Sequence, residues 1–144
     1  MSPESVEIVR RADDAFLAGL ERGDIAGGVA TGLVSEEHEL IVVAEFPGQR
    51  SYRGHEGLVE FVRRWTEDFE RFSMQRTELI DGGDGRVFSG YRQSAIGKGS
   101  RVPTEVEFFC VYEVEDGKLA RTRHYLDRDD ALKAAGLREQ NTTT

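Results

Sequence analysis

Apolar and polar residues alternate along two stretches near the end of the chain, which predicts a long antiparallel hairpin from Arg101 to Leu126. The turn is expected at Asp116-Gly117, because glycine reaches positive φ without steric cost and Asp-Gly between alternating runs is a strong hairpin signal. Strand residues point to two faces in turn. One face of the first strand is therefore a row of apolar side chains: Val106, Phe108, Cys110, Tyr112 and Val114.

The returning strand places a histidine on this apolar side. Its two faces carry Ala120, Thr122, His124 and Leu126 on one and Leu119, Arg121, Arg123 and Tyr125 on the other. Arg121 and Arg123 are expected opposite the glutamates of the first strand, as cross-strand ion pairs require. His124 then lies among apolar residues, where it is either a hydrogen-bonded core histidine or part of a pocket.

Helical periodicity, caps and turn residues predict the remaining elements. The expected helices are 2–22, 24–33, 54–72 and 131–135, and the expected strands are 38–46, 49–53, 74–81 and 86–96. Strands and helices do not alternate, so the expected fold class is α+β, with helices packed on one face of a curved antiparallel sheet. Residues 1–137 are expected to form a single domain and residues 138–144 a polar, disordered tail.

The composition narrows the possible partners and surroundings. A net charge of −8, with acidic and basic residues interleaved, argues against a nucleic-acid partner. The single cysteine, Cys110, forms no internal disulfide and fits a reducing cytoplasm. No stretch is apolar enough for a signal peptide or a membrane span, so we expect a soluble, cytoplasmic protein without a membrane partner.

Three stretches carry a resemblance to a known family: Arg22-Gly23-Asp24, residues 52–57 (Tyr-Arg-Gly-His-Glu-Gly), and residues 116–137. In this order and spacing, the chain resembles the nuclear transport factor 2-like superfamily and, within it, the SnoaL-like group. The resemblance implies a cone in which the curved sheet wraps a deep apolar pocket closed by the N-terminal helices. It also implies a homodimer through the outer sheet face, which would use Phe109, Val111 and Tyr125.

The superfamily hosts isomerases, dehydratases, epoxide hydrolases, polyketide cyclases and non-catalytic binders, so the resemblance does not choose an activity. Glu45 is the first catalytic candidate. It falls where ketosteroid isomerases of this fold carry their general base, and it ends an apolar strand just before the Pro47-Gly48 turn. Burial in an apolar cavity would raise the pKa of its carboxyl towards the range of a working acid or base. The alternative is a solvated glutamate at a strand end.

The resemblance to ketosteroid isomerases does not extend to the residues that stabilise the enolate. Those enzymes stabilise an enolate with a tyrosine and a protonated aspartate. The corresponding positions here hold Phe16 and, at or next to the aspartate position, Cys110. Neither side chain is a strong hydrogen-bond donor. Steroid isomerisation is therefore rejected, while the pocket and the possible base are retained.

His124 is the second catalytic candidate, because imidazole titrates close to physiological pH. With Glu45 it would form an acid–base pair for proton abstraction next to a carbonyl, followed by cyclisation, or for addition of water. Asp127 lies near the acidic residue that SnoaL-type cyclases carry after the last strand, but a helix N-cap is the simpler interpretation. The expected ligand-binding residues are Phe16, Trp65, Tyr91, Cys110 and Tyr112.

No metal or cofactor is expected, because His38, His55 and His124 are scattered and have no ligand spacing around them. Two hypotheses of function follow. In the first, the protein is a cofactor-independent isomerase, cyclase or hydratase acting on a small apolar molecule. In the second, it is a non-catalytic ligand-binding or dimeric interaction module, which a cavity smaller than roughly 300 Å³ would favour.

Overall fold

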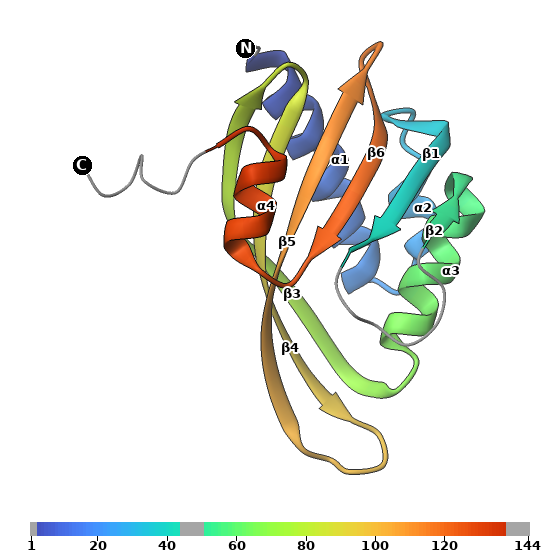
Figure 1. Ribbon diagram of the computed structural model, residues 1–144. Helices are drawn as coiled ribbons and strands as arrows, with labels where there is room; N and C mark the ends of the chain where they lie inside the picture. The colour runs from blue at the N-terminus through green and yellow to red at the C-terminus, as the bar shows by residue number, and fades with distance from the viewer. Residues whose placement is uncertain (1–2, 44–50, 138–144) are drawn as a thin grey trace.

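One six-stranded sheet organises the computed structural model, which describes residues 3–43 and 51–137 (Figure 1). The sheet order is β2-β1-β6-β5-β4-β3, with β1 parallel to β6 and the other neighbours antiparallel. The strands are β1 (Val34–Val42), β2 (Ser51–Arg53), β3 (Phe69–Gly83), β4 (Arg86–Gly97), β5 (Pro103–Glu115) and β6 (Lys118–Tyr125). The helices are α1 (Pro3–Glu21), α2 (Ile25–Val29), α3 (Gly54–Thr66) and α4 (Arg128–Ala134).

Helices cover both faces of the sheet, and each face has its own core (Figure 1). On the inner face, α1 and α3 pack over a cluster that includes Tyr91, Phe108 and Tyr112. On the outer face, α4 packs over a second cluster that includes Phe88 and Phe109. The α+β class and the curved sheet predicted from the sequence are confirmed, except that α4 also covers the outer face.

The β5–β6 hairpin forms as predicted. Asp116 and Gly117 adopt φ values of 53° and 77° in its turn. Cys110 pairs with His124 across the two strands, so His124 does share the apolar inner face. Arg121 and Arg123 both form ion pairs with Glu113 on the other face.

One detail of the hairpin differs from simple alternation. The register shifts between Glu113 and Val114, which pair with Arg121 and Leu119 respectively. This bulge leaves Ala120 as the extra residue and reverses the alternation beyond it. Leu119 therefore packs in the inner core instead of sharing a face with Arg121.

Two predicted helices are too long. The third helix ends at Thr66, and Phe69 and Phe72 belong to β3, where they pair with Gly97 and Ala95 of β4. Their spacing continues the helical stripe, but strand pairing overrides this local pattern. The second helix ends at Val29 and β1 begins earlier than expected, at Val34.

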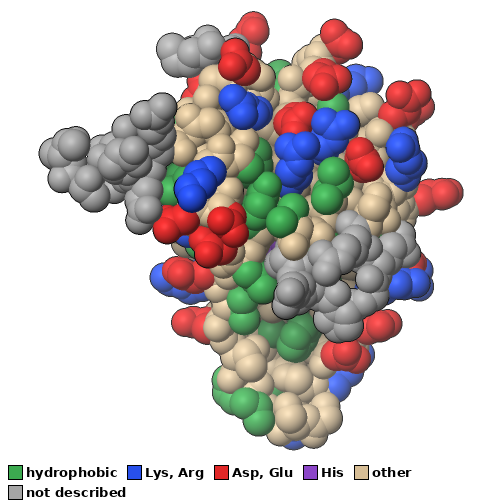
Figure 2. Space-filling view, in the orientation of Figure 1, with side chains coloured by type: hydrophobic (Ala, Val, Ile, Leu, Met, Phe, Trp, Pro, Cys, Tyr) green, Lys and Arg blue, Asp and Glu red, His purple; other side chains and the backbone are tan. Residues whose placement is uncertain are grey.

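The three outer-face side chains that were expected at a subunit interface are covered by a helix of the same chain. Phe109, Val111 and Tyr125 are only 7%, 0% and 8% exposed because they lie beneath α4 within the same chain. The sequence predicts the short C-terminal helix but not its docking on these side chains. Beside α4, acidic and basic side chains are interspersed on the visible face (Figure 2). The predicted tail, residues 138–144, lies outside the described residues.

Candidate functional site

A cavity of about 90 Å³ lies between the inner face of the sheet and helices α1, α2 and α3. Strands β1, β3, β4, β5 and β6 also contribute to its wall. Five residues of this wall were predicted from the sequence to contact a ligand: Phe16, Trp65, Tyr91, Cys110 and Tyr112. Their places on α1, α3, β4 and β5 follow from the helical stripes and from strand alternation.

Aromatic rings enclose His124 at one side of this cavity. The His124 ring stacks on Phe108 with centroids 4.6 Å apart, and the rings of Trp65 and Phe61 each lie 5.8 Å away. Only 3% of His124 is exposed. Burial lowers the pKa of His124 to about 4, so the imidazole is neutral at neutral pH. A neutral imidazole carries one N–H donor and one nitrogen acceptor.

His38 is a second buried histidine in the cavity wall, which the sequence analysis considered only as a metal ligand. Its Nε2 lies 2.8 Å from the Thr122 hydroxyl oxygen, and its Nδ1 has no hydrogen-bond partner among the described residues. Burial is the main reason that the pKa of His38 is lowered to about 4. The signal was present in the sequence, because His38 is in strand phase with the apolar residues Leu40 and Val42.

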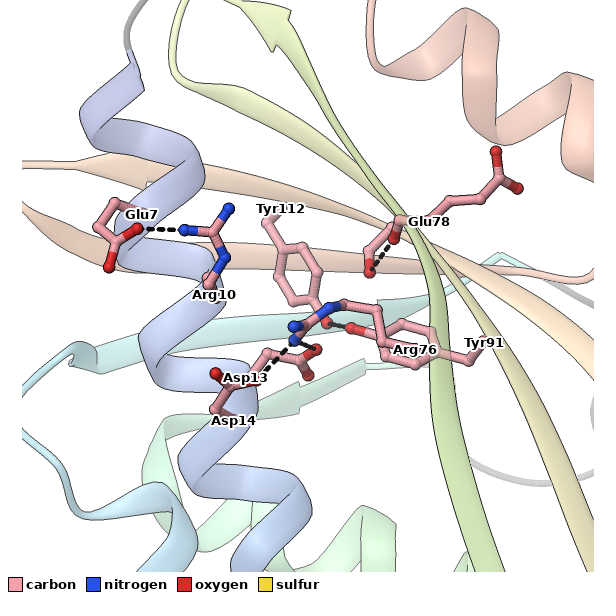
Figure 3. Close-up of polar contacts among 9 residues, drawn as sticks. Glu7, Arg10, Asp13, Asp14, Arg76, Glu78, Tyr91 and Tyr112 are labelled. Atoms are coloured by element: carbon pink, nitrogen blue, oxygen red, sulfur yellow. Dashed lines mark hydrogen bonds and ion pairs between the residues drawn. The ribbon is translucent and has the colours of Figure 1, made fainter.

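Asp13 of α1 is a buried carboxylate in the same wall, and the sequence analysis also missed it. Arg76 Nη1 lies 2.9 Å from an oxygen of Asp13 and 2.9 Å from an oxygen of Asp14 (Figure 3). Burial raises the pKa of Asp13, while hydrogen bonds from Arg76 and Tyr91 oppose that shift. Asp13 follows Val9 by four residues on the buried stripe of the helix, where a carboxylate signals a specific role.

Tyr91 and Tyr112 line the same cavity as Asp13 and contact each other. Their hydroxyl oxygens are 2.5 Å apart (Figure 3). Burial raises the pKa values of both phenols well above the usual value, so both remain protonated at neutral pH. The Cys110 thiol, whose pKa burial also raises, faces Tyr112. It is a protonated, apolar group rather than a nucleophile.

Of the other two catalytic candidates, Glu45 lies outside the described residues. Asp127 is exposed, and its carboxylate accepts hydrogen bonds from the amides of Asp129 and Asp130 as the N-cap of α4. Asp127 does not line the cavity.

Within residues 3–43 and 51–137, no group of three or more His, Cys, Asp or Glu side chains is arranged to hold a metal ion. In the same part of the chain, no helix is long and apolar enough to cross a membrane.

Comparisons with known proteins agree with this architecture. TerC, co-crystallised with polyporic acid, has a TM-score of 0.68 and 16% identity over 86% of this chain and 92% of TerC. A Catenulispora acidiphila protein of ketosteroid isomerase-like fold, in complex with trimethylamine, has a TM-score of 0.65 and 17% identity over 88% and 92% of the two chains. An NTF2-like protein from Burkholderia thailandensis has a TM-score of 0.70 and 21% identity over 91% and 95%.

These structural similarities, at such low identity, show the fold. The sequence matches no curated protein. Residues 14–122 match the sequence model of the SnoaL-like domain, which is well over half of the 144-residue chain and runs from α1 to β6. The protein therefore belongs to the SnoaL-like domain family of the NTF2-like fold.

Proposed function

We propose that this protein binds a compact, largely apolar small molecule in the cavity between the sheet and the N-terminal helices. The observation that carries the proposal is an apolar, ring-lined wall into which Asp13, Tyr112 and two neutral histidines converge. Such a combination is typical of ligand sites, where apolar walls supply affinity and a few polar groups supply orientation. The binding of polyporic acid by TerC and of trimethylamine by the Catenulispora protein supports it.

The size of the cavity restricts the ligand. About 90 Å³ is well below the roughly 300 Å³ at which pockets for drug-sized ligands begin. It is also below the roughly 150 Å³ of an apolar cavity that accommodates benzene. The large side chains of Phe61, Trp65 and Tyr112 are part of the cavity wall. Of the two hypotheses from the sequence, the cavity size favours ligand binding without catalysis.

Trp65 offers a direct test of binding, because it lines the cavity and is the only tryptophan in the chain. Its indole N–H gives a single NMR cross-peak, which we expect to shift saturably on addition of 2-propanol or acetone, each of which is smaller than benzene. Ala12→Leu should abolish the shift, because Ala12 is buried in the cavity wall. Ala18→Leu, the same change at an exposed position of α1, should preserve it. An unresponsive wild-type cross-peak with both ligands would reject the proposal.

The neutral His124 imidazole favours a second candidate function, cofactor-independent proton transfer. With a pKa of about 4, His124 is a weak base and a better hydrogen-bond donor to a carbonyl oxygen. The base would be Glu45, which follows Val43 by two residues. The Val43 amide donates to the His124 carbonyl oxygen at 2.9 Å. In this scheme Glu45 removes a proton next to the carbonyl and returns it to another carbon or to oxygen.

Exchange of the methyl protons of acetone, which lie next to its carbonyl group, with D₂O tests this second function without knowledge of the natural substrate. The wild-type protein should accelerate exchange, and Glu45→Gln should lower the acceleration by about 10²-fold or more. Ala12→Leu, with the cavity filled, is the matched background. Equal rates for wild type and Ala12→Leu, or an unchanged rate in Glu45→Gln, would exclude Glu45-dependent catalysis while leaving ligand binding intact.

A further inference from the structure

A single carboxylate sets the electrostatic character of the cavity. Asp13 lines the wall and is 4% exposed, and among the described residues no other acidic side chain, lysine or arginine lines it. The histidines of the wall add no positive charge at neutral pH, because burial lowers the pKa values of His38 and His124 to about 4. The wall therefore holds one negative charge and no positive charge.

Arg76, the cation beside Asp13, compensates this charge only in part. Its Nη1 lies 2.9 Å from an oxygen of Asp13 and 2.9 Å from an oxygen of Asp14, so one guanidinium is shared by two carboxylates (Figure 3). The three side chains together carry a net negative charge. Burial raises the pKa of Asp13, but the hydrogen bond from the permanently protonated guanidinium opposes this rise and favours the ionised carboxylate.

Aromatic rings form much of the remaining wall. They come from helices α1 and α3 and from strands β4 and β5: Phe16, Phe61, Trp65, Tyr91, Phe108 and Tyr112. The face of such a ring attracts a cation within about 6 Å of its centre. In a cavity of about 90 Å³, every atom of a ligand lies close to the wall. The carboxylate and the rings together favour a cation that carries apolar groups.

His38 adds a hydrogen-bonding nitrogen to the same wall. It is 1% exposed, its Nε2 lies 2.8 Å from the Thr122 hydroxyl oxygen, and its Nδ1 has no hydrogen-bond partner among the described residues. The hydroxyl can accept a hydrogen bond as well as donate one, so it is compatible with the tautomer in which Nδ1 is an acceptor. An N–H group of a ligand would satisfy this nitrogen.

We propose that the cavity selects small alkylammonium ions, with the charged nitrogen stabilised by the Asp13 carboxylate and the alkyl groups packed against the aromatic wall. The inference rests on the proposed binding function and specifies its ligand class as protonated aliphatic amines. Transfer of an ammonium group from water into a buried site is costly, and the opposite charge of Asp13 and the ring faces offset this cost. A carboxylate ligand would meet the Asp13 charge without a compensating cation, so anions are excluded.

Four probes of similar size test the inference through the Trp65 indole cross-peak. Isopropylammonium and 2-propanol share a carbon skeleton and differ in charge, and acetate and acetone form the corresponding anionic pair. At pH 7, with the ionic strength held constant by sodium chloride, we expect wild type to bind isopropylammonium about tenfold more tightly than 2-propanol, the size of one charge-assisted contact. Acetate should bind about tenfold more weakly than acetone, or not at all.

Asp13→Asn should remove the preference for the ammonium ion. The substitution deletes the charge and keeps the size of the side chain, so the affinity for isopropylammonium should fall to that for 2-propanol, which should be unchanged. Glu21→Gln is the matched control, because it removes an acidic charge from an exposed position of the same helix. It should retain the full preference. Thermal unfolding of each variant verifies that it is folded.

Arg76→Gln should change the preference in the opposite direction. It removes the cation that the protein itself supplies to Asp13, so isopropylammonium becomes the counter-ion and should bind more tightly than to wild type. The ammonium ion should also raise the midpoint of thermal unfolding more in this variant than in wild type, because a tighter ligand of the folded state stabilises it more. Arg10→Gln, at an exposed arginine of α1 that pairs with Glu7, is the control and should behave as wild type.

The outcomes separate this inference from the binding proposal. A preference for isopropylammonium that is lost in Asp13→Asn, kept in Glu21→Gln and increased in Arg76→Gln supports it. Equal binding of the ammonium ion and 2-propanol by wild type, a preference for the alcohol, or binding of acetate as tight as that of acetone overturns the inference while the binding proposal stands. A preference that survives in folded Asp13→Asn also overturns it, and if that variant does not fold, an unchanged preference in Arg76→Gln does so. A wild-type cross-peak that responds to none of the four probes overturns both proposals.

Discussion

His124 stacks on Phe108 with the two rings 17° from parallel and their centroids 4.6 Å apart. The contact places an ionisable ring against an apolar one in a site with almost no access to water. Desolvation disfavours the charged imidazolium, which explains the direction of the pKa shift. The same burial that keeps the His124 imidazole neutral makes the fold sensitive to acid.

Acid should destabilise the protein through His124. The pKa of His124 falls from 6.5 to about 4 on folding, so the unfolded chain binds more protons between these values. Its contribution to stability is therefore complete above pH 6.5 and is lost as the pH falls towards 4. His124 alone should account for a loss of about 2 kcal/mol in the free energy of unfolding at pH 5 relative to pH 8, and His38, with a similar shift, adds to the total loss. Urea denaturation of wild type and of a His124 variant at the two pH values separates the His124 contribution.

His124→Phe is the matched variant, because phenylalanine preserves the ring against Phe108 and has no proton to gain. Its loss of stability between pH 8 and pH 5 should be about 2 kcal/mol smaller than that of wild type. His38 has a similarly lowered pKa and remains in both proteins, so its contribution cancels in the comparison. Identical pH dependence in the two proteins would show that His124 is not protonated less readily in the folded state.

Asp127 should contribute to stability rather than to binding. Its carboxylate accepts from two backbone amides at the start of α4, so Asp127→Ala should lower the free energy of unfolding by about 1 kcal/mol. Ligand-induced shifts of the Trp65 cross-peak should be unchanged. Asp130→Ala, an exposed acidic position in the first turn that does not act as the N-cap, is the control and should have a smaller effect. Loss of ligand binding in a folded Asp127→Ala variant would contradict this prediction and show that Asp127 contributes to the ligand site.

Strand alternation was sufficient to predict the inner face of the hairpin. Phe108, Cys110, Tyr112 and His124 meet in the cavity because residues two apart point the same way and the Asp-Gly turn fixes the register. Strand alternation gave the wrong face for Leu119. The bulge beside it depends on the pairing of both strands and cannot be recognised from the pattern of one strand.

The buried polar residues were harder to recognise. Asp13 and Arg76 are 63 positions apart, and only the packing of α1 against β3 makes the carboxylate acceptable inside the fold. His38 was dismissed as a metal ligand because no metal-binding motif surrounds it. Its position on the same strand face as the apolar Leu40, which indicates burial, was not considered. The place of Glu45 remains a prediction, because it lies outside the described residues.

Removing Arg76 should leave a buried charge on Asp13. Arg76→Gln is expected to cost about 3 kcal/mol or more of stability at neutral pH, because breaking a buried ion pair strands the other partner. Without Arg76, the pKa of Asp13 should rise further. The destabilisation caused by the unpaired Asp13 charge should become smaller as acid protonates the carboxylate. The difference in unfolding free energy between wild type and Arg76→Gln should therefore shrink from pH 7 to pH 5.

Asp13→Asn combined with Arg76→Gln provides the control for the ion pair. The double variant lacks both charges, so it should recover part of the stability that Arg76→Gln loses. A double variant that is less stable than Arg76→Gln by the full effect of Asp13→Asn would show that the two residues are not coupled. Urea denaturation of the four proteins at pH 7 completes the cycle.

A substitution of Phe109 tests whether the outer face of the sheet is covered by α4 of the same chain or by a second subunit. It is buried beneath α4 and stacks on Phe88 with centroids 5.9 Å apart, so we expect Phe109→Ala to cost about 3–5 kcal/mol of stability. If α4 covers this face in solution, the loss should not depend on protein concentration, because no subunit interface is broken. Lys133→Ala, an exposed position on α4, should leave stability unchanged within about 0.5 kcal/mol.

The sequence-based expectation of a dimer through Phe109, Val111 and Tyr125 makes the opposite prediction. In that case Phe109→Ala would shift the sedimentation equilibrium of the protein towards a smaller species, and dilution of wild type would lower its midpoint of unfolding. Because α4 already buries all three side chains, we expect neither effect. Any dimer of this protein would then use another surface, and Phe109→Ala would leave its dissociation constant unchanged while weakening each protomer.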